Sequence, residues 1–551
     1  MQAKEILLTA FEQAFSDLGL EKPEKITFER PKQPKFGDLS TNVAMLIAKQ
    51  AGRPARELAA SLAQELPRKC PEIARVEVAG PGFCNITFKP AFWQRVLPLI
   101  EETGPAYGNG TSGQGKTALV EYVSANPTGP LHVGHGRGAA LGDSVARILR
   151  AAGYGVDTEY YLNDAGRQMK ILGRSVWLRA RELAGQKTDF PEDHYQGGYI
   201  IDLAREALNA HPGLPDLDED AGVELCRQFG MEKILADIKG DMLLFRCEHN
   251  KFASEKAYLQ NGAVARALEQ LEKDGHSYHS DGALWLRTES EGDDHDRVLR
   301  KRDGSLTYLA TDIAYHNEKY ERGYDLLVDV WGADHHGYIP RMRAAIRDMG
   351  RDPDRFVVLL VQLVNLIRDG KPVQMSTRSG EFYPLRELID EVGTDAARFT
   401  FLSRSNDSPL DFDVDLAKKR SLDNPVYYVQ YAHARICALL RRAAEKGIRL
   451  PEKTGSATLT GLDSLQELAL MRQLSAFPEI VTEAAARLAP YLVSKYLIDL
   501  AGEIHGYYAH RQIIDPDDEA GSLARLVLLR ACGQTLKNGL FLLGVSAPEL
   551  M

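Results

Sequence analysis

Residues 117–163 read TALVEYVSANPTGPLHVGHGRGAALGDSVARILRAAGYGVDTEYYLN, and this stretch decides the fold. Its first eight residues have the β-branched and apolar composition of a strand. Apolar residues then recur with helical spacing over 134–154, and 156–163 is strand-like again. A strand, a helix and a second strand in this order predict a parallel sheet with a right-handed crossover, so we expect an α/β fold.

The turn between the first strand and the helix has the features of a nucleotide site. His132 and His135 lie three residues apart at the opening of the helix, where N–H groups and the positive end of the helix dipole are available. Two imidazoles there can donate to phosphate oxygens, and Gly134 and Gly136 leave room for a nucleotide against the backbone. Two histidines at this spacing are usually structural or surface residues, but the strand–turn–helix context favours the nucleotide site.

A second glycine-rich segment, GTSGQGKT at 110–117, matches the letters of the phosphate-loop pattern. That loop works only where a strand precedes it and a helix follows, because backbone N–H groups then face the phosphates. Here a Gly/Pro-rich segment precedes it and a strand-like segment follows, so we interpret 104–115 as a linker. GHGRG at 134–138 likewise lacks the G-x-G-x-x-G spacing of a dinucleotide-binding turn.

Further units are expected on both sides of this core. Residues 1–105 predict a small α+β unit, with a helix over 3–18, a second helix, and two strands around a Pro-Gly turn. Helical and polar material over about 165–280 indicates an insertion. Strand composition resumes at 282–287, 325–332 and 356–366, and the pattern is helical from about 421 to the end.

Composition sets broader limits. The 551 residues are 44% hydrophobic and 26% charged, which is typical of a soluble globular protein. The apolar run at 356–367 is too short to span a bilayer and reads as one buried strand. Six scattered cysteines without a CxxC pair, and no secretion signal, predict a cytoplasmic protein with reduced thiols. The net charge of −10 argues only weakly against a nucleic-acid partner, because phosphate binding needs local positive potential.

HVGH in this setting resembles the HIGH motif of class I aminoacyl-tRNA synthetases. The longer segment ANPTGPLHVGHGR (125–137) closely resembles the version found in arginyl-tRNA synthetases. Other segments are similar to the blocks of that family in the same order along almost the whole chain. They are GDLSTNVA (37–44), YLNDAGRQM (161–169), TYLATDIAYH (307–316), GADHHGY (332–338), VQMSTRSG (373–380) and FTFLSRSNDSPLDFD (399–413).

The resemblance implies a Rossmann-like parallel-sheet catalytic domain, a small α+β N-terminal domain and an all-α C-terminal helical bundle. It divides the chain into a tRNA-contacting domain (1–105), a catalytic domain (106–380), a stem-contact region (381–420) and an anticodon-binding domain (421–551). It also implies ATP-dependent activation of L-arginine, with Mg²⁺, and transfer to tRNA(Arg) by a cytoplasmic monomer that activates arginine only with tRNA bound. A small-molecule nucleotidyltransferase and a non-catalytic RNA-binding relative remain alternatives.

Carboxylates are the expected partners of arginine, because its planar guanidinium pairs with them through two hydrogen bonds. Glu121 lies on the strand that leads into the HVGH turn, and Tyr308 and Asp312 lie four residues apart. Read alone, such acids are usually solvated. By resemblance, Glu121, Tyr308 and Asp312 hold the arginine side chain, and Asn126 binds its α-amino or carboxylate end.

The segment QMSTRSG (374–380) resembles the KMSKS loop, which contacts ATP. Met375 and Ser376 remain, and we assign both to ATP binding. Gln374 and Thr377 stand where the family pattern has lysines, so the cation that neutralises the leaving pyrophosphate is a different group. A polar, Gly-flanked surface loop is the less favoured alternative.

Mg²⁺ can supply part of the missing charge. Lys371 and Arg378 are the nearest candidates for the rest, and we assign Arg378 a catalytic role. The cluster at 334–336 is a poor metal site, because adjacent residues point apart, and we expect no resident metal ion.

A basic and aromatic stretch enters the helical end of the chain. Basic groups bind phosphates and aromatic rings stack on unpaired bases, although such a face is often only solvated and such rings often belong to the core. The resemblance makes tRNA its partner. The residues are Lys418, Lys419, Arg420, Tyr427, Tyr428, Tyr431, Arg435, Arg441 and Arg442.

Overall fold

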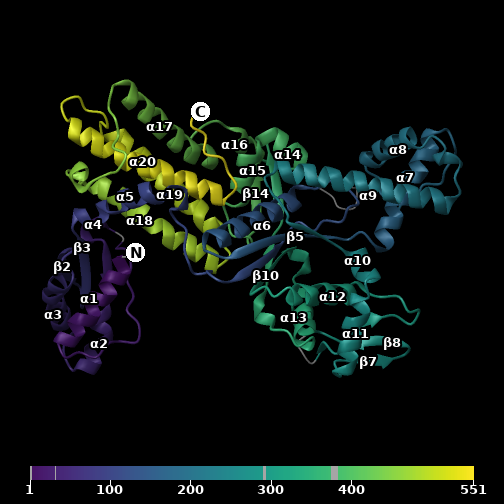
Figure 1. The fold of residues 1–551 in the computed structure, drawn as a ribbon, viewed down its shortest axis with the longest axis horizontal. Helices are drawn as coiled ribbons and strands as arrows, with labels where there is room; N and C mark the ends of the chain where they lie inside the picture. Colours follow the sequence, from purple (N-terminus) through teal and green to yellow (C-terminus); the bar gives the residue numbers. More distant parts are fainter. Residues whose placement is uncertain (1–2, 32, 290–292, 374–382) are drawn as a thin grey trace.

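The computed structural model describes residues 3–31, 33–289, 293–373 and 383–551. The molecule is elongated, with the N-terminal unit at one end and a helical projection at the other (Figure 1). No helix of the described residues has the length and apolarity needed to cross a membrane. The six cysteines are all free thiols.

A five-stranded sheet with the order β11-β10-β4-β5-β6 forms the centre, and every neighbouring pair is parallel. The expected α/β fold is therefore confirmed. The edge strand β6 was not predicted, because 165–280 was expected to be helical and polar. The strands are β4 (Thr117–Glu121), β5 (Gly155–Leu162), β6 (Lys251–Ser254), β10 (Leu326–Gly332) and β11 (Phe356–Val361).

Helix α6 (Val133–Ala151) is the crossover between β4 and β5, and nearly all of its residues are buried. Gly142 allows its close approach to the sheet, because a Cβ there would lie 2.3 Å from the Tyr122 side chain. The segment at 110–117 ends in β4 rather than in a helix, which agrees with its interpretation as a linker.

Two expected strands belong to other sheets. The run at 356–367 was predicted as one buried strand, and this is wrong, because β11 ends at Val361 and β12 (Val364–Arg368) pairs elsewhere. β12 lies between β14 (Leu410–Asp413) and the short β13 (Lys371–Pro372). The predicted strand at 282–287 exists as β8, but it lies in a separate antiparallel sheet. That sheet comprises β7 (Ser277–Ser280), β8 (Ala283–Leu286) and β9 (Arg297–Arg300).

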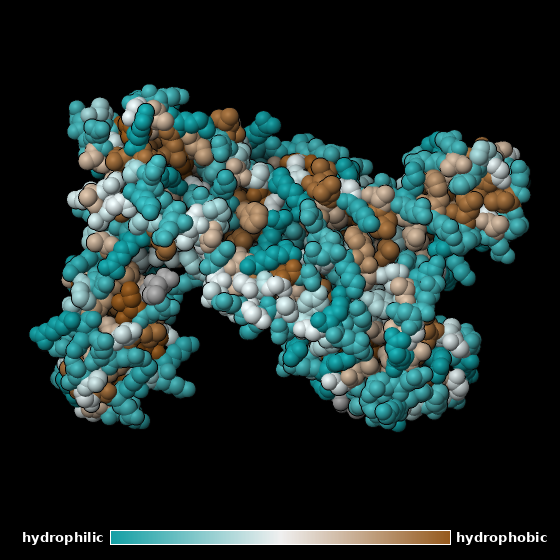
Figure 2. All heavy atoms as spheres, viewed as in Figure 1, coloured by the Kyte–Doolittle hydropathy of each residue, from teal (hydrophilic) through white to brown (hydrophobic). Residues whose placement is uncertain are grey.

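The helices between β5 and β11 form two lobes. Helices α7 to α9 project from the body, and helices α10 to α13 pack beside the sheet (Figure 1). Figure 2 shows a mostly hydrophilic surface with hydrophobic patches on the projection. The helices are α7 (Gly166–Leu183), α8 (Gly198–Ala210), α9 (Glu219–Leu244), α10 (Glu255–Gln260), α11 (Ala263–Lys273), α12 (Tyr308–Glu321) and α13 (Tyr338–Asp348).

The N-terminal unit is α+β. Helices α2 and α3 pack on an antiparallel sheet of order β1-β3-β2, and α1 packs on α3. It is tied to the helical end by an ion pair between Asp38 and Arg472, and Asp38 also accepts hydrogen bonds from the Phe88 N–H and the Trp93 indole. The elements are α1 (Ala3–Asp17), β1 (Leu39–Thr41), α2 (Val43–Ala51), α3 (Ala55–Lys69), β2 (Ile73–Ala79) and β3 (Phe83–Phe88), followed by α4 (Pro90–Gln94) and α5 (Val96–Thr103).

The last part of the chain is helical, as predicted. Its long helices pack on one another, and α18 also contacts α4, α5 and α6, which joins the three parts of the molecule. The helices are α14 (Leu385–Val392), α15 (Thr394–Phe401), α16 (Val414–Lys418), α17 (Pro425–Glu445), α18 (Leu465–Ala486), α19 (Tyr491–His510) and α20 (Glu519–Leu542).

Candidate active site

The two histidines of the HVGH turn lie together at the start of α6. His132 is the N-cap residue, and its Nδ1 accepts hydrogen bonds from the N–H groups of Gly134 (3.1 Å) and His135 (3.4 Å). The Nδ1 of His135 accepts one from the His132 N–H in return, at 3.2 Å. The rings stack with their centroids 3.7 Å apart. The backbone of the turn therefore fixes both rings.

The same hydrogen bonds fix the tautomer. Because each Nδ1 accepts N–H groups, the proton of each neutral ring sits on Nε2. Burial lowers the pKa of His132, and burial together with the neighbouring His132 lowers the pKa of His135 to about 3. Both imidazoles are thus neutral hydrogen-bond donors near pH 7, which suits the stabilisation of charge on a phosphate oxygen.

The glycines of the turn differ in their surroundings. A Cβ on Gly134 would meet only the His132 ring, at 3.0 Å. A Cβ on Gly136 would lie 2.5 Å from Leu385 and 3.2 Å from Phe401. The expected room for a nucleotide is therefore absent on that side of Gly136, where the missing side chain permits helix packing.

The segment before the turn has a strained backbone. Val123 and Ser124 lie two and three residues after the end of β4 and have φ angles of 70° and 42°, a region that residues with a Cβ rarely adopt. Tyr160 on β5 donates a hydrogen bond to the Ala125 carbonyl (2.7 Å) and helps to hold this segment. Such strain is often found at binding sites. Here it turns the chain away from the sheet, and Asn126 is exposed beyond it.

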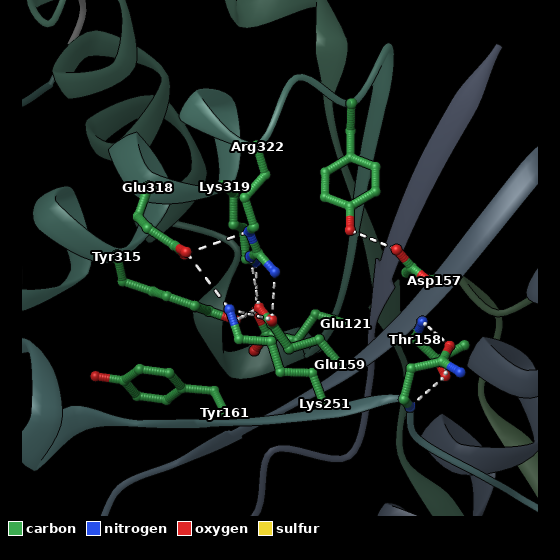
Figure 3. Close-up of polar contacts among 12 residues, drawn as sticks. Glu121, Asp157, Thr158, Glu159, Tyr161, Lys251, Tyr315, Glu318, Lys319 and Arg322 are labelled. Atoms are coloured by element: carbon green, nitrogen blue, oxygen red, sulfur yellow. Dashed lines mark hydrogen bonds and ion pairs between the residues drawn. The ribbon is translucent and has the colours of Figure 1, made fainter.

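Glu121, at the end of β4, is held by a buried cation (Figure 3). Its Oε2 accepts hydrogen bonds from Lys319 and from the Tyr315 hydroxyl (2.7 Å), and its Oε1 accepts one from Ser124 (2.7 Å). Lys319 is fully buried and also donates to Asp329 at 2.7 Å. Glu121 and Asp329 are register partners on adjacent strands, so one ammonium bridges two neighbouring carboxylates.

The charges in this cluster oppose the effect of burial. Burial raises the pKa of Glu121, and Lys319 offsets only part of the rise. For Asp329, burial is outweighed by Lys319 and His316, so its pKa is lowered. Burial acts to lower the pKa of Lys319, but the carboxylates around it raise it, so the ammonium stays charged.

A second ion pair lies beside the first. Arg322 donates two hydrogen bonds to Glu159 of β5, at 2.6 and 3.0 Å, and the Tyr315 hydroxyl lies 2.6 Å from the same carboxylate. Figure 3 shows these side chains from β4, β5 and α12 converging on one point. Lys319, Tyr315, Arg322 and Glu159 were not predicted from the sequence. Three of them could have been found from the sequence, because Tyr315, Lys319 and Arg322 are spaced to lie on one face of a helix.

Asp312 lies one turn before this cluster on α12. It is partly buried and accepts a hydrogen bond from the Tyr338 hydroxyl at 2.5 Å. Burial raises its pKa, while that hydrogen bond lowers it. Tyr308, one turn earlier, is 58% exposed. The structure thus places Asp312 near the end of β4, with Tyr308 and Asn126 toward solvent.

The predicted loop at 374–380, with Met375, Ser376 and Arg378, lies outside the described residues. Further along the chain, residues 383–385 are held against the HVGH turn, because Leu385 N–H donates to the Leu131 carbonyl (2.8 Å) and Val133 N–H to the Tyr383 carbonyl (3.2 Å). Lys371 lies exposed on β13. The described chain after residue 382 therefore begins beside the two histidines.

The remaining predicted features lie on the surface. Asp334, His335 and His336 are exposed, and no group of three potential metal ligands occurs among the described residues. On α17, the rings of Tyr427 and Tyr431 stack at 5.9 Å, and Tyr431 also stacks on His505.

Some cations of the basic stretch already form contacts within the protein. The Arg435 guanidinium lies 3.5 Å from the Tyr508 ring centroid, and Lys418 pairs with Glu391 at 3.1 Å. On α17, stacked aromatic rings therefore lie beside the Arg435 guanidinium.

Three family models cover most of the chain. The arginyl tRNA synthetase N terminal domain matches residues 5–88, and the class I (R) tRNA synthetase catalytic domain matches 103–200 and 227–410. The DALR anticodon binding domain matches 429–551. The chain belongs to the arginyl-tRNA synthetase family.

Relatives of this synthetase match along its full length. The arginine–tRNA ligase of Desulfovibrio desulfuricans is 57% identical over 551 residues, and that of Nitratidesulfovibrio vulgaris is 54% identical, each over all of both chains. A putative arginyl-tRNA synthetase structure from Campylobacter jejuni has a TM-score of 0.77 at 34% identity, covering 84% of this chain and 100% of its own. The Thermus thermophilus structure, at 23% identity, has a TM-score of 0.75 over all of both chains and supports the fold.

Proposed function

We propose that this chain activates L-arginine with ATP and transfers the arginyl group to tRNA(Arg). The observation that carries the proposal is the full-length match, at 57% identity, to an arginine–tRNA ligase. The fixed histidine pair and the acid cluster at the end of β4 supply the groups that this chemistry needs.

The reaction has two steps. A carboxylate oxygen of arginine attacks the α-phosphorus of ATP, which forms arginyl-adenylate and releases pyrophosphate. A terminal ribose hydroxyl of tRNA then attacks the carbonyl carbon, which forms the ester and releases AMP. The neutral His132 and His135 donate hydrogen bonds to phosphate oxygens as charge grows there. Arg378 or Lys371 supplies positive charge to the leaving pyrophosphate, and Mg²⁺ bound to the ATP phosphates would supply part of the rest.

Substrate arginine is held at the end of β4. Asp312 and Tyr308 receive the guanidinium, and Glu121 contributes through Oε1, because Oε2 already accepts from both Lys319 and Tyr315 while Oε1 accepts only from Ser124. Asn126, exposed beyond the strained segment, binds the α-amino or carboxylate end. A guanidinium placed between fixed carboxylates can form paired, charge-assisted hydrogen bonds.

Transfer RNA contacts several parts of the chain. The helices from 421 onward bind the anticodon region, residues 381–420 contact the stem, and the N-terminal unit (1–105) contacts the tRNA body. Figure 2 shows an open notch between that unit and the lobe that contains α11 and α13, which leaves this face accessible. The protein acts in the cytoplasm as a monomer.

Pyrophosphate exchange tests the first step. The full chain is assayed with each of twenty amino acids, with and without tRNA(Arg). We expect exchange with arginine and with none of the other amino acids, and only when tRNA(Arg) is present. Exchange without tRNA would contradict the tRNA requirement, and no exchange with arginine under any condition would contradict the proposed activation.

A further inference from the structure

The first helices and the first sheet of the chain form an α+β body (residues 3–31 and 33–88) at one end of the molecule (Figure 1). Helices α4 and α5, which follow this body, pack on α18, and α5 also packs on α20. The body itself reaches α18 through polar side chains. The pairs are Lys4 with Glu479, Arg30 with Gln473, and Asp38 with Arg472.

One of these three pairs is buried. The Asp38 side chain is 3% exposed and that of Arg472 is 18% exposed, whereas Lys4 and Glu479 are 49% and 53% exposed. Water and salt screen an exposed ion pair strongly, and a buried pair much less. The pair of Asp38 and Arg472 is therefore the contact best able to fix the orientation of the α+β body on α18.

Asp38 is itself held rigidly within the α+β body. Its Oδ2 accepts hydrogen bonds from the Phe88 N–H (2.7 Å) and the Trp93 indole (3.2 Å), and its own N–H donates to the Ile86 carbonyl (2.8 Å). Its Oδ1 accepts from the arginine of α18. Gly37 permits this arrangement, because its φ is 93° and a Cβ there would lie 2.7 Å from the Ile86 oxygen. One carboxylate thus joins the sheet, the connecting helix α4 and α18.

Close packing does not fix the orientation of the α+β body in the same way. A cavity of about 450 Å³ lies between this body and helices α18 and α19, and Phe28, Trp93, Lys495 and Tyr496 contribute to its lining. Domains move relative to each other unless a large apolar interface joins them. The angle between the two parts therefore depends on the polar contacts, and above all on the buried pair.

We propose that Asp38 and Arg472 are positioning residues for tRNA. Their ion pair fixes the orientation at which the α+β body and the helical end contact one tRNA(Arg) at the same time. This inference rests on the proposed function, in which the N-terminal unit contacts the tRNA body and the helical end binds the anticodon region. When two contacts share one rigid frame, the second becomes intramolecular, and the affinity gained is lost where the geometry forbids both together.

The expected effect of losing the pair is confined to tRNA. Without it the α+β body samples many orientations, and few of them permit both contacts. Linked contacts gain about 10²–10⁴ in affinity, and we expect the variants to lose about tenfold of this in KM for tRNA(Arg). The kcat at saturating tRNA should stay within about twofold of the parent, because the lost interaction is one of binding and not of the transition state.

A double-mutant cycle on the full chain tests the pair. Arg472→Met removes the cation, and Asp38→Asn removes the charge while keeping an acceptor for the hydrogen bonds within the α+β body. The asparagine variant leaves no buried charge unpaired, so it guards against a loss of folding in Arg472→Met. Each single variant should raise the KM for tRNA(Arg) about tenfold, and the double variant no further. Effects that multiply in the double variant would overturn the assignment to one shared contact.

An RNA hairpin with the anticodon stem and loop of tRNA(Arg) separates orientation from damage to the helical end. The hairpin can reach only the helical end, so its inhibition constant in aminoacylation should be the same in the parent and in both single variants. A hairpin that weakens as much as the full tRNA would show that the helical end itself has changed, and would overturn the positioning role.

Lys4→Met is the matched control, because it removes one cation from the same interface but from an exposed pair. Its KM for tRNA(Arg) should be parental; a rise equal to that of Arg472→Met would reduce the effect to lost charge and overturn the proposal. Parental KM values in both Arg472→Met and Asp38→Asn would also overturn it, while leaving arginine activation intact. A parent that charges no tRNA with arginine would overturn the proposed function itself.

Discussion

Replacing Lys319 by methionine removes the one ammonium that bridges Glu121 and Asp329. Methionine has a similar length and no charge, so the packing around α12 changes little. Two neighbouring buried carboxylates then lack their common partner. Breaking a buried ion pair from one side typically costs about 3–5 kcal/mol, because the remaining charge stays desolvated. We expect a loss of unfolding free energy in that range at pH 7.5.

Lys251→Met is the matched control. Lys251 also lies beside Glu159, at 3.5 Å, but its side chain is 44% exposed. Ion pairs at exposed sites contribute about 1 kcal/mol or less. The control variant should therefore stay within about 1 kcal/mol of the parent, although it loses the same side chain from the same cluster.

The dependence on pH gives a second check. Burial raises the pKa of Asp329, but Lys319 and His316 outweigh it, and the pKa is lowered. A carboxylate with a lowered folded pKa contributes stability above its unfolded pKa, and this is lost as the pH falls through the folded value. Without Lys319 the effect of burial on the pKa of Asp329 dominates. Protonation of this carboxylate then removes part of the destabilisation in the variant. The difference in unfolding free energy between variant and parent should therefore become smaller from pH 7.5 to pH 5.

Urea unfolding followed by tryptophan fluorescence measures these differences, because Trp331 lies on β10, two residues after Asp329. A Lys319→Met variant as stable as the parent at pH 7.5 would refute the assignment of Lys319 as the structural counter-ion. A difference that grows as the pH falls would refute the electrostatic explanation.

Other predictions concern the reaction. Changing either histidine of the HVGH turn to alanine should slow adenylate formation roughly ten- to a thousandfold with little change in arginine binding; steady-state aminoacylation at the parental rate in both would show that the pair is not catalytic. Asp312→Asn should reduce kcat/KM for arginine at least about thirtyfold, and Glu121→Gln should reduce it less, since Lys319 already neutralises that acid; the reverse order in aminoacylation kinetics would contradict this. Arg378→Ala should slow pyrophosphate exchange more than Lys371→Ala, and parental rates in both would place the missing cation elsewhere.

The core of the fold could be predicted from local patterns. The strand, turn and helix of 117–154 carry their periodicity in the sequence, and the structure has β4 and α6 there. Strand β6 has only four residues, KFAS, and its alternation is too short to detect. The sheet to which β8 belongs could not be predicted, because strand pairing depends on contacts far apart in the chain.

The candidate active site, like the fold, combines features that are local in the sequence with features that depend on residues far apart in the chain. The histidine pair is local, because the cap geometry follows from three residues at a helix start. The bridge between Lys319 and Glu121 joins residues 198 positions apart, and a lysine on an amphipathic helix normally reads as solvated. Gly136 was interpreted as room for a nucleotide, whereas Leu385, far along the chain, fills the space beside it.

Aminoacylation of tRNA(Arg) by the purified full chain, with each of the twenty amino acids and ATP, tests the central claim most directly. Arginine should be esterified to tRNA(Arg) in a reaction that depends on ATP, and the other amino acids should give no stable product. Charging with a different amino acid, or no charging with arginine while the protein is folded and binds tRNA(Arg), would contradict the proposed function.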